Sequence, residues 1–173
     1  DFGEAFDRLR SGGEETYRSQ RHSVEFVASL VPEFTVTTVS FCGRPHDDDL
    51  LSGLRSVGLT TDQRGNRAQL HQLLTQINPT LAIVRTPNPH ILSWLTTRNI
   101  PTLCCFADIF TEQKHDGLLA PWRRFRDSQR LEHLTTLLNH PAITAVCNHN
   151  LNASLSLVNY LHIPTDKIMA WDW

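Results

Sequence analysis

The stretch TLCCFADIF (Thr102–Phe110) decides the class of fold, because it is a nearly continuous apolar run that begins just after Pro101. Alternation of apolar and polar residues is typical of a strand with one wet face, whereas a continuous apolar run is typical of a strand covered on both faces. Comparable runs are TLAIVRT (Thr80–Thr86), ITAVCN (Ile143–Asn148), KIMAWDW (Lys167–Trp173) and FTVTTVSFC (Phe34–Cys42). The sequence therefore predicts strands buried inside an α/β protein.

Helical patterns lie between these runs. Apolar residues recur at helical spacing over Glu14–Val31, Asn66–Ile77, Asn88–Arg98, Pro121–Asn139 and Asn150–Leu161. Alternation of helices and buried strands predicts a doubly wound, mostly parallel, Rossmann-like sheet with right-handed crossovers. The region Gly43–Arg67 is the least regular, and we expect a short helix and a weak strand near Ser56–Leu59 there.

The alternation begins with a helix, although a glycine-rich turn in such a sheet normally follows the first, central strand. The opening stretch DFGEAFDRLR (Asp1–Arg10) is polar and charged and does not read as a strand. We therefore expect residues 1–173 to form a single Rossmann-like domain without its first strand, as part of a larger two-domain protein.

Composition excludes some classes of function. The formal net charge is −2, so no basic excess is present to hold nucleic acid through its phosphates. The sequence contains no apolar run long enough to span a bilayer and does not open with a signal-peptide pattern. The four cysteines lie in or beside apolar runs without C-x-x-C spacing, which predicts buried, reduced thiols in a cytoplasmic protein.

The stretch SGGEETYRSQ (Ser11–Gln20) places two glycines before a predicted helix. Gly12 and Gly13 would let a ligand approach the backbone, and a helix start would direct unpaired N–H groups at the same place. Carboxylates at Glu14 and Glu15 would repel a phosphate but suit a ligand rich in hydroxyl groups, such as a sugar. The alternative is a plain flexible turn followed by acids at a helix start.

Two further residues follow predicted strands at the edge where ligands of open α/β sheets lie. Arg85 could neutralise a diphosphate or an acidic acceptor, or could form an ion pair with a neighbouring carboxylate. His149 is suited to proton transfer near neutral pH and could contact a donor substrate, while Asn150 has the side chain of a helix N-cap.

Two charged stretches allow two interpretations each. PWRRFRDSQR (Pro121–Arg130) could lie on a membrane surface, or Trp122 and Phe125 could face the core beneath a solvated basic face. HDDD (His46–Asp49) could bind a divalent cation, but consecutive aspartates more often cap and solvate a following helix. We therefore expect no metal site.

In their order along the chain, these motifs resemble the N-terminal half of a GT-B glycosyltransferase of the GT4 type. The resemblance rests on GGEE…VEFVASL, FTVTTVSF, INPTLAIVRTPNPHILSWL, NIPTLCCFADIF and PAITAVCNHNLNASLSLVNYLHIPTDKIMAW, and it covers nearly the whole chain. Each motif is weak singly, and their order and spacing carry the likeness.

The resemblance implies a retaining, metal-independent transfer of a sugar from a nucleotide-sugar donor to a sugar or lipid-linked acceptor, without a cofactor. Gly12 and Gly13 match the family's loop near the donor phosphate and acceptor, and Asp108 matches a residue that ends the family's fourth strand. Ala107 stands where many members carry a histidine that holds the donor sugar. Some members contact membranes peripherally, and a fragment without the donor half would be inactive.

The alternative is a non-catalytic, Rossmann-like binding module for a small sugar or phosphate ligand or for a protein partner. Ala107 in place of the family's histidine favours this second interpretation. Fold alone does not decide between a transferase and a module, because the same sheet supports many functions.

Overall fold

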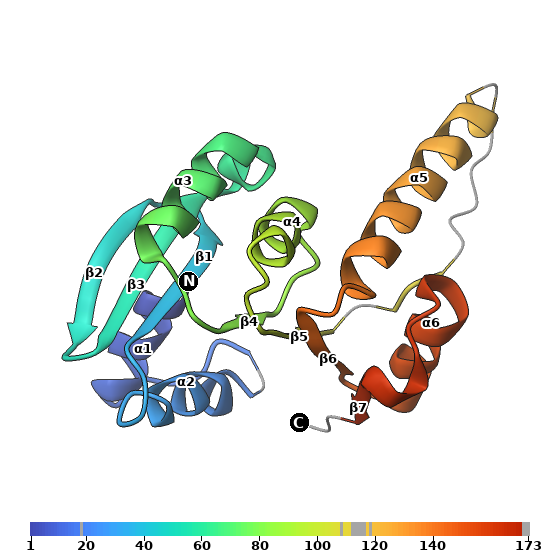
Figure 1. Ribbon diagram of the computed structural model, residues 1–173. Helices are drawn as coiled ribbons and strands as arrows, with labels where there is room; N and C mark the ends of the chain where they lie inside the picture. Colours follow the sequence, from blue (N-terminus) through green and yellow to red (C-terminus); the bar gives the residue numbers. More distant parts are fainter. Residues whose placement is uncertain (18, 108, 112–116, 118, 171–173) are drawn as a thin grey trace. The chain divides into compact units, whose positions relative to one another are not determined.

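The computed structural model describes residues 1–17, 19–107, 109–111, 117 and 119–170. The chain divides into two compact units, Asp1–Leu70 and His71–Trp173, which are described separately below. The chain contains both helices and strands, which alternate from α3 onward, so the α/β class predicted from the sequence is confirmed (Figure 1).

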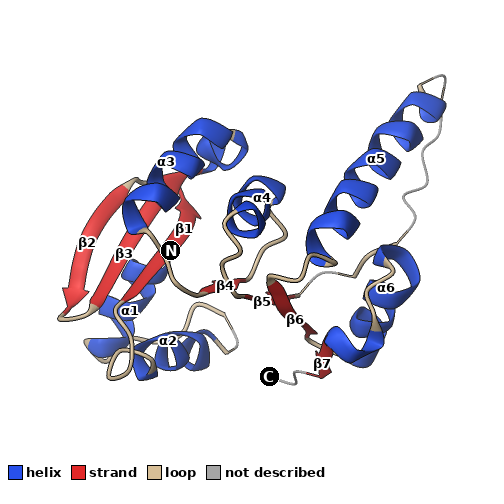
Figure 2. Ribbon diagram, viewed as in Figure 1, coloured by secondary structure: helices blue, strands red, loops and turns tan. Residues whose placement is uncertain are grey.

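The second unit contains a parallel sheet of four strands in the order β4-β5-β6-β7 (Figure 2). These strands are β4 (Ala82–Val84), β5 (Thr102–Phe106), β6 (Ile143–Asn148) and β7 (Ile168–Ala170). Val84 pairs with Cys104, and Phe106 pairs with Asn148. Four of the five runs predicted as buried strands therefore form one parallel, Rossmann-like sheet, in which each strand is shorter than or equal to its predicted run. The fifth run, Phe34–Cys42, forms a strand of the other sheet, so the prediction of one sheet for all five was wrong.

Helices connect these strands in the way that parallel pairing requires. They are α4 (Pro89–Thr97), α5 (Ala120–Leu138) and α6 (Leu151–Leu161), and a further helix, α3 (Arg67–Ile77), begins at the end of the first unit and precedes β4. Asn88 caps α4 by accepting hydrogen bonds from the backbone N–H groups of His90 and Ile91. Asn150 caps α6, since its Oδ1 accepts from the Ala153 N–H at 2.8 Å, which confirms the predicted N-cap.

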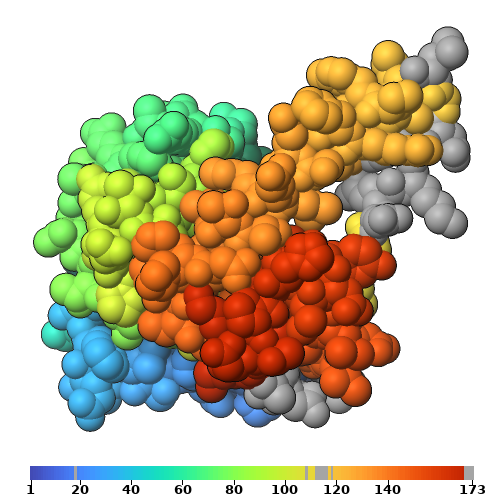
Figure 3. Space-filling model, turned by 45° about the vertical axis from the view of Figure 1, so that its right-hand side comes forward, coloured from blue at the N-terminus to red at the C-terminus, as the bar shows by residue number. Residues whose placement is uncertain are grey.

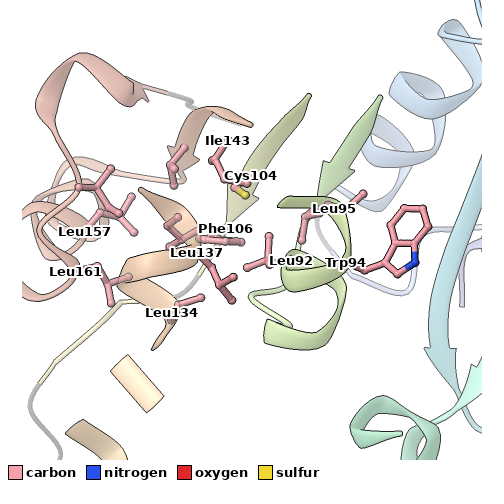
Figure 4. Close-up of a cluster of buried hydrophobic side chains, with 14 of the residues drawn as sticks. Leu92, Trp94, Leu95, Cys104, Phe106, Leu134, Leu137, Ile143, Leu157 and Leu161 are labelled. Carbon is pink, nitrogen blue, oxygen red and sulfur yellow. The ribbon is translucent and has the colours of Figure 1, made fainter. Parts of the chain in front are cut away.

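The core of the second unit lies between the sheet and its helices. Figure 4 shows Phe106 of β5 among leucines from α4 and α5, with Ile143 of β6 nearby. Leu92, Leu138, Ile143, Leu157 and Leu161 are fully buried, and each such side chain contributes on the order of 1.5–3 kcal/mol of transfer free energy. The sheet and its helices thus share one continuous apolar core.

The first unit contains a three-stranded sheet in the order β1-β3-β2. Strand β1 (Val36–Cys42) pairs in parallel with β3 (Leu54–Thr60), and β2 (His46–Leu51) pairs antiparallel with β3. The turn between β2 and β3 requires Gly53, which has a φ of +88°. A short 3₁₀ helix, η1 (Thr61–Gly65), follows.

The hairpin corrects the prediction for Gly43–Arg67. The expected strand and short helix are present as β3 and η1, but β2 was missed. The HDDD stretch lies within β2, so the prediction that its aspartates cap a following helix was wrong. Asp47 instead accepts hydrogen bonds of 2.7 and 2.6 Å from the Arg55 guanidinium of β3, and this partner lowers the pKa of the Asp47 carboxyl.

Two helices cover the apolar side of this sheet. Helix α1 (Phe2–Arg10) forms in the polar opening stretch, because Asp1 caps its first turn and Ala5, Phe6 and Leu9 fall on one buried stripe. Helix α2 (Gln20–Ser29) begins six residues later than predicted. The predicted start at Glu14 was wrong because the glycines before it end α1 rather than open a helix.

Candidate functional site

The carboxyl edge of the parallel sheet in the second unit carries two of the predicted site residues, at the ends of the strands that flank β5. Arg85 directly follows β4, and His149 directly follows β6. Between them, Ala107 follows β5 and is exposed. Since ligands of open parallel α/β sheets lie outside the carboxyl ends of the strands, we take this edge as the candidate functional site.

Arg85 supplies a cation at this edge. Its position after Val84 places it beside Cys105 of β5, because Val84 pairs with Cys104 in the parallel register. Burial raises the pKa of the Cys105 thiol to about 12, and the positive charge of Arg85 acts in the opposite direction. The Arg85 side chain is exposed and can therefore meet an anionic group from solution.

His149 is held in one orientation by its neighbour Asn148, which is 1% exposed. Asn148 Oδ1 accepts from the His149 backbone N–H at 2.9 Å and lies 3.0 Å from His149 Nδ1. Asn148 Nδ2 in turn donates to the Ala153 carbonyl at 3.3 Å. An amide oxygen only accepts, so the network assigns a proton to Nδ1, which makes Nε2 the accepting nitrogen of the neutral ring.

A cavity of about 310 Å³ lies beside the β4–α4 loop and the segment after β5. Its walls include Pro87, Ile109 and Thr111, and α5 contributes Asp127, Arg130 and His133. Mixed apolar walls with a few polar groups are typical of small-ligand sites. The sequence analysis missed these α5 residues, although spacings of three residues place Asp127, Arg130 and His133 along one side of a helix.

The glycines of the first unit have a structural role that the sequence analysis did not assign. Gly12 N donates to the Leu9 carbonyl at 3.2 Å, and Gly13 N donates to the Arg8 carbonyl at 2.8 Å. With a φ of +85° at Gly12, this pattern is a Schellman motif, which ends α1. At Gly13 a Cβ atom would lie 2.6 Å from Arg8 Cγ, so glycine is required there.

Glu14 and Glu15, which follow the glycines, make different contacts. The backbone carbonyl of Glu14 accepts from Arg8 Nε at 3.1 Å, and the residue is exposed. The Glu15 carboxylate accepts from the Arg21 N–H in the first turn of α2, where an anion is favoured by the helix dipole. Gly12, Gly13 and Glu14 therefore belong to the first unit, whereas Arg85 and His149 belong to the second.

Asp108, the predicted catalytic residue, lies outside the described residues. The four cysteines are free and buried, as predicted. Burial raises the pKa of the Cys104 thiol to about 12, so this thiol is a neutral core group. Within the described ranges, one group of side chains has donor atoms close enough for a shared ion, namely Asp1, Cys42 and His46 of the first unit.

The stretch predicted as either a membrane surface or a core face forms the N-terminal half of α5. Trp122 and Phe125 are 60% and 61% exposed, so the prediction that they face the core was wrong. Arg126 lies over the Trp122 ring at 5.1 Å, and Figure 3 shows this end of α5 standing clear of α6. Among the described helices, we find none with the length and apolar content needed to cross a membrane.

Comparison of the chain with models of known protein families finds no match. Comparison with curated proteins likewise finds no match.

Proposed function

We propose that this chain is the acceptor-side part of a cytoplasmic glycosyltransferase that moves a sugar from a nucleotide-sugar donor to a sugar or lipid-linked acceptor. The observation that supports the proposal is the position of Arg85 and His149, which follow strands β4 and β6 at the carboxyl edge of one parallel sheet. The buried, free thiols agree with a reducing compartment. The order of motifs along the chain points to the same family.

The chemistry follows from what these groups can supply. Retaining transfer proceeds through an oxocarbenium-like transition state while negative charge grows on the departing diphosphate. A guanidinium at Arg85 stabilises that charge, and a fixed imidazole at His149 accepts a hydrogen bond from a sugar hydroxyl through Nε2. Asp108 takes the catalytic position that the resemblance gives it. Placement of the two substrates then accounts for much of the rate enhancement.

The second candidate is a binding module without catalysis. Ala107 favours it, because a methyl group replaces the imidazole that would hold the donor sugar. In this case the edge would still bind a sugar or a phosphate through Arg85 and His149, but donor would not be consumed. The two functions therefore place the ligand at the same edge of the sheet, but only the transferase consumes its donor.

The test is release of nucleotide from UDP- and GDP-linked sugars by the full-length protein that carries this sequence, with and without a panel of sugar and lipid-linked acceptors. We expect release that falls at least tenfold in His149→Asn and Arg85→Gln. The matched controls are His162→Asn and Arg98→Gln, which change the same residue types after the carboxyl ends of α6 and α4. Release of nucleotide that is equal in all variants overturns the placement of the site.

Binding of a donor or a sugar without release of nucleotide would favour the binding module over the transferase. Here the folded protein binds a donor or a sugar with an affinity that falls in His149→Asn and not in His162→Asn, and nucleotide is never released. Absence of both release and binding, in a protein shown to be folded by circular dichroism, contradicts both candidates.

We also propose that the N-terminal half of α5 contacts a membrane surface, where a lipid-linked acceptor would lie. Trp122 and Phe125 are exposed in a stretch that holds four arginines and one aspartate. Aromatic rings enter the headgroup region, while arginines are attracted to anionic lipids. The exposure of both rings is the observation that supports this contact.

Cosedimentation with vesicles measures this contact. We expect the protein to bind vesicles that contain phosphatidylserine, and to bind them several-fold less when Trp122 and Phe125 are both changed to Ala. Leu151→Ala is the control, because Leu151 is another exposed apolar residue, at the start of α6. Equal binding by all three proteins, or no binding by the unchanged protein, overturns the proposal.

A further inference from the structure

The three-stranded sheet of the first unit brings a thiol and an imidazole together over one glycine. His46 of β2 pairs with Gly58 of β3, and Cys42 ends β1 on the other side of β3. A Cβ atom at Gly58 would lie 2.2 Å from His46 Nδ1 and 2.7 Å from Cys42 Sγ. The two side chains therefore fill the space that the missing side chain leaves, and they converge above the central strand.

Helix α1 adds a carboxylate to this pair. Asp1 is the N-cap of α1, and its Oδ1 accepts from the Gly3 N–H at 2.8 Å. Its second oxygen, Oδ2, lies 3.2 Å from His46 Nδ1. The donor atoms of Asp1, Cys42 and His46 all lie within 4.8 Å of one another. One oxygen thus caps the helix while the other faces the imidazole and the thiol.

From this arrangement we propose that Asp1, Cys42 and His46 form a binding site for a divalent ion of the zinc class. Zinc binds thiolate, imidazole and carboxylate together, whereas magnesium and calcium prefer oxygen alone. With bonds of about 2.0 Å to oxygen and nitrogen, two ligands of a tetrahedral zinc lie about 3.3 Å apart. The separation of 3.2 Å between Asp1 Oδ2 and His46 Nδ1 agrees with this distance between two zinc ligands.

The second nitrogen of His46 has the partner that a metal-binding histidine needs. His46 Nε2 lies 3.0 Å from Ser56 Oγ, and Ser56 is fully buried in β3. A histidine that binds a metal through one nitrogen usually donates a hydrogen bond through the other, which fixes the ring. Ser56 can accept this bond, so it acts as a positioning residue for His46.

The site can be entered and leaves one coordination position open. The side chains of His46 and Asp1 are 16% and 15% exposed, and Cys42 is 9% exposed. Three protein ligands leave the fourth tetrahedral position for water or for a backbone oxygen. Binding replaces the proton of the Cys42 thiol, which leaves to solvent, while His46 binds as a neutral imidazole whose proton lies on Nε2.

The proposed site is independent of the glycosyltransferase proposal. It lies in the first unit, and it ties β1, β2 and α1 together through one ion. We therefore expect its effect on stability, rather than on sugar transfer. An ion that binds the folded state and not the unfolded state raises the melting temperature, and the rise grows with the logarithm of the free ion concentration above the Kd.

The test is a titration of the metal-free full chain with Co²⁺, which reports thiolate ligation through a charge-transfer absorption. We expect one equivalent to give this absorption, and Zn²⁺ to displace it. Cys42→Ser and His46→Gln should abolish it, whereas Cys104→Ser, which changes another buried thiol, should leave it intact. Ser56→Ala should weaken the affinity by about 10–100-fold, as loss of a positioning partner does.

A second measurement keeps the proposal testable where a variant folds poorly. Zn²⁺ should slow alkylation of Cys42 in the unchanged protein and raise its melting temperature, and neither effect should occur in Asp1→Asn at the same ion concentration. The proposal is overturned if the absorption persists in Cys42→Ser. It is also overturned if the folded, unchanged protein binds neither ion.

Discussion

Arg8 Nη2 lies 2.9 Å from Gln20 Oε1, so a side chain of α1 contacts the first residue of α2. Gln20 is 5% exposed, and its Oε1 also accepts from the Thr16 N–H at 2.9 Å. Arg8 Nε reaches the Glu14 carbonyl as well. Arg8 thereby fixes the connection between the two helices, including the stretch that follows the glycines.

Loss of the Arg8 guanidinium should therefore destabilise the first unit. Arg8→Met keeps much of the aliphatic stem but leaves the buried Gln20 amide with one partner fewer. We expect the free energy of unfolding to fall by about 1–3 kcal/mol, as for hydrogen bonds to a charged group. Urea denaturation measures this change.

Glu4→Gln is the control for Arg8→Met. It removes only the exposed ion pair between Glu4 and Arg8, which has a separation of 3.2 Å. Such a pair on a helix surface is worth about 0.2–0.5 kcal/mol. Equal effects of the two changes would contradict the role assigned to the buried contact with Gln20.

The Schellman motif at the end of α1 predicts different outcomes for three glycines. Gly12→Ala should cost about 1–2 kcal/mol, because φ at this residue is +85°. Gly13→Ala should lower the free energy of unfolding by more than a surface substitution does, because the new Cβ meets both Cγ and the carbonyl oxygen of Arg8. Gly65→Ala, where nothing lies within 4 Å, should be within about 0.5 kcal/mol of the unchanged protein.

Thermal denaturation of the three variants distinguishes a structural turn from a flexible one. If Gly12→Ala and Gly13→Ala have the same melting temperature as Gly65→Ala, the Schellman motif does not stabilise the end of α1. Because substitution at Gly13 is expected to disturb the fold, loss of activity in such a variant would not by itself place Gly13 in a substrate site.

The second unit was the more predictable part of the fold. Each of its strands is marked in the sequence by proline or by a continuous apolar run, and residues such as Cys104 and Val146 are fully buried, as such runs predict. Parallel pairing also follows from the helices between the strands. The placement of Arg85 and His149 at one edge was therefore predictable, because each directly follows an apolar run.

The first unit was less predictable, because its signals depend on partners distant in sequence. The charged strand β2 pairs on one side with β3, and its Asp47 is matched by Arg55 across the hairpin. No apolar run marks such an edge strand. In α1, the stripe of Phe2, Phe6 and Leu9 was a usable signal that the charged residues between them obscured. The approach of Asp1 to His46 joins a helix cap to a strand and has no local signature.

Lys167 closes the C-terminal end of α5 and should matter for stability. Its Nζ donates to the carbonyls of Asn139 and His140 at 3.1 and 3.0 Å, where a cation also complements the helix dipole. Lys167→Met should lower the free energy of unfolding by about 1–2 kcal/mol. Chemical denaturation measures it, with the neighbouring exposed change Asp166→Asn as the control. A loss no greater than that of the control would contradict the contact.

The thiols of the second unit should be unreactive while the protein is folded. Burial raises the pKa of Cys104 and of Cys105 from 9.0 to about 12. At pH 8 we expect iodoacetamide to label these residues only after unfolding, and peptide mass spectrometry identifies the labelled residue. Rapid labelling of Cys104 in the folded protein would contradict its place in the core.

The raised pKa values of these two thiols also make the free energy of unfolding depend on pH. Between pH 9 and about 12 the unfolded chain loses these thiol protons while the folded protein keeps them. The contribution is thus fully present below pH 9 and is lost as pH rises through this window. We expect Cys104→Ala to flatten the decline in melting temperature above pH 9. An unchanged slope in that variant would contradict burial of an ionisable thiol.

NMR of the histidine rings during titration with UDP- and GDP-linked sugars tests whether the carboxyl edge of the parallel sheet is the ligand site. The His149 signal is assigned by its absence from His149→Asn. We expect this signal to shift in a saturable manner while that of His162 stays in place. Saturable binding that leaves the His149 signal unmoved would contradict it.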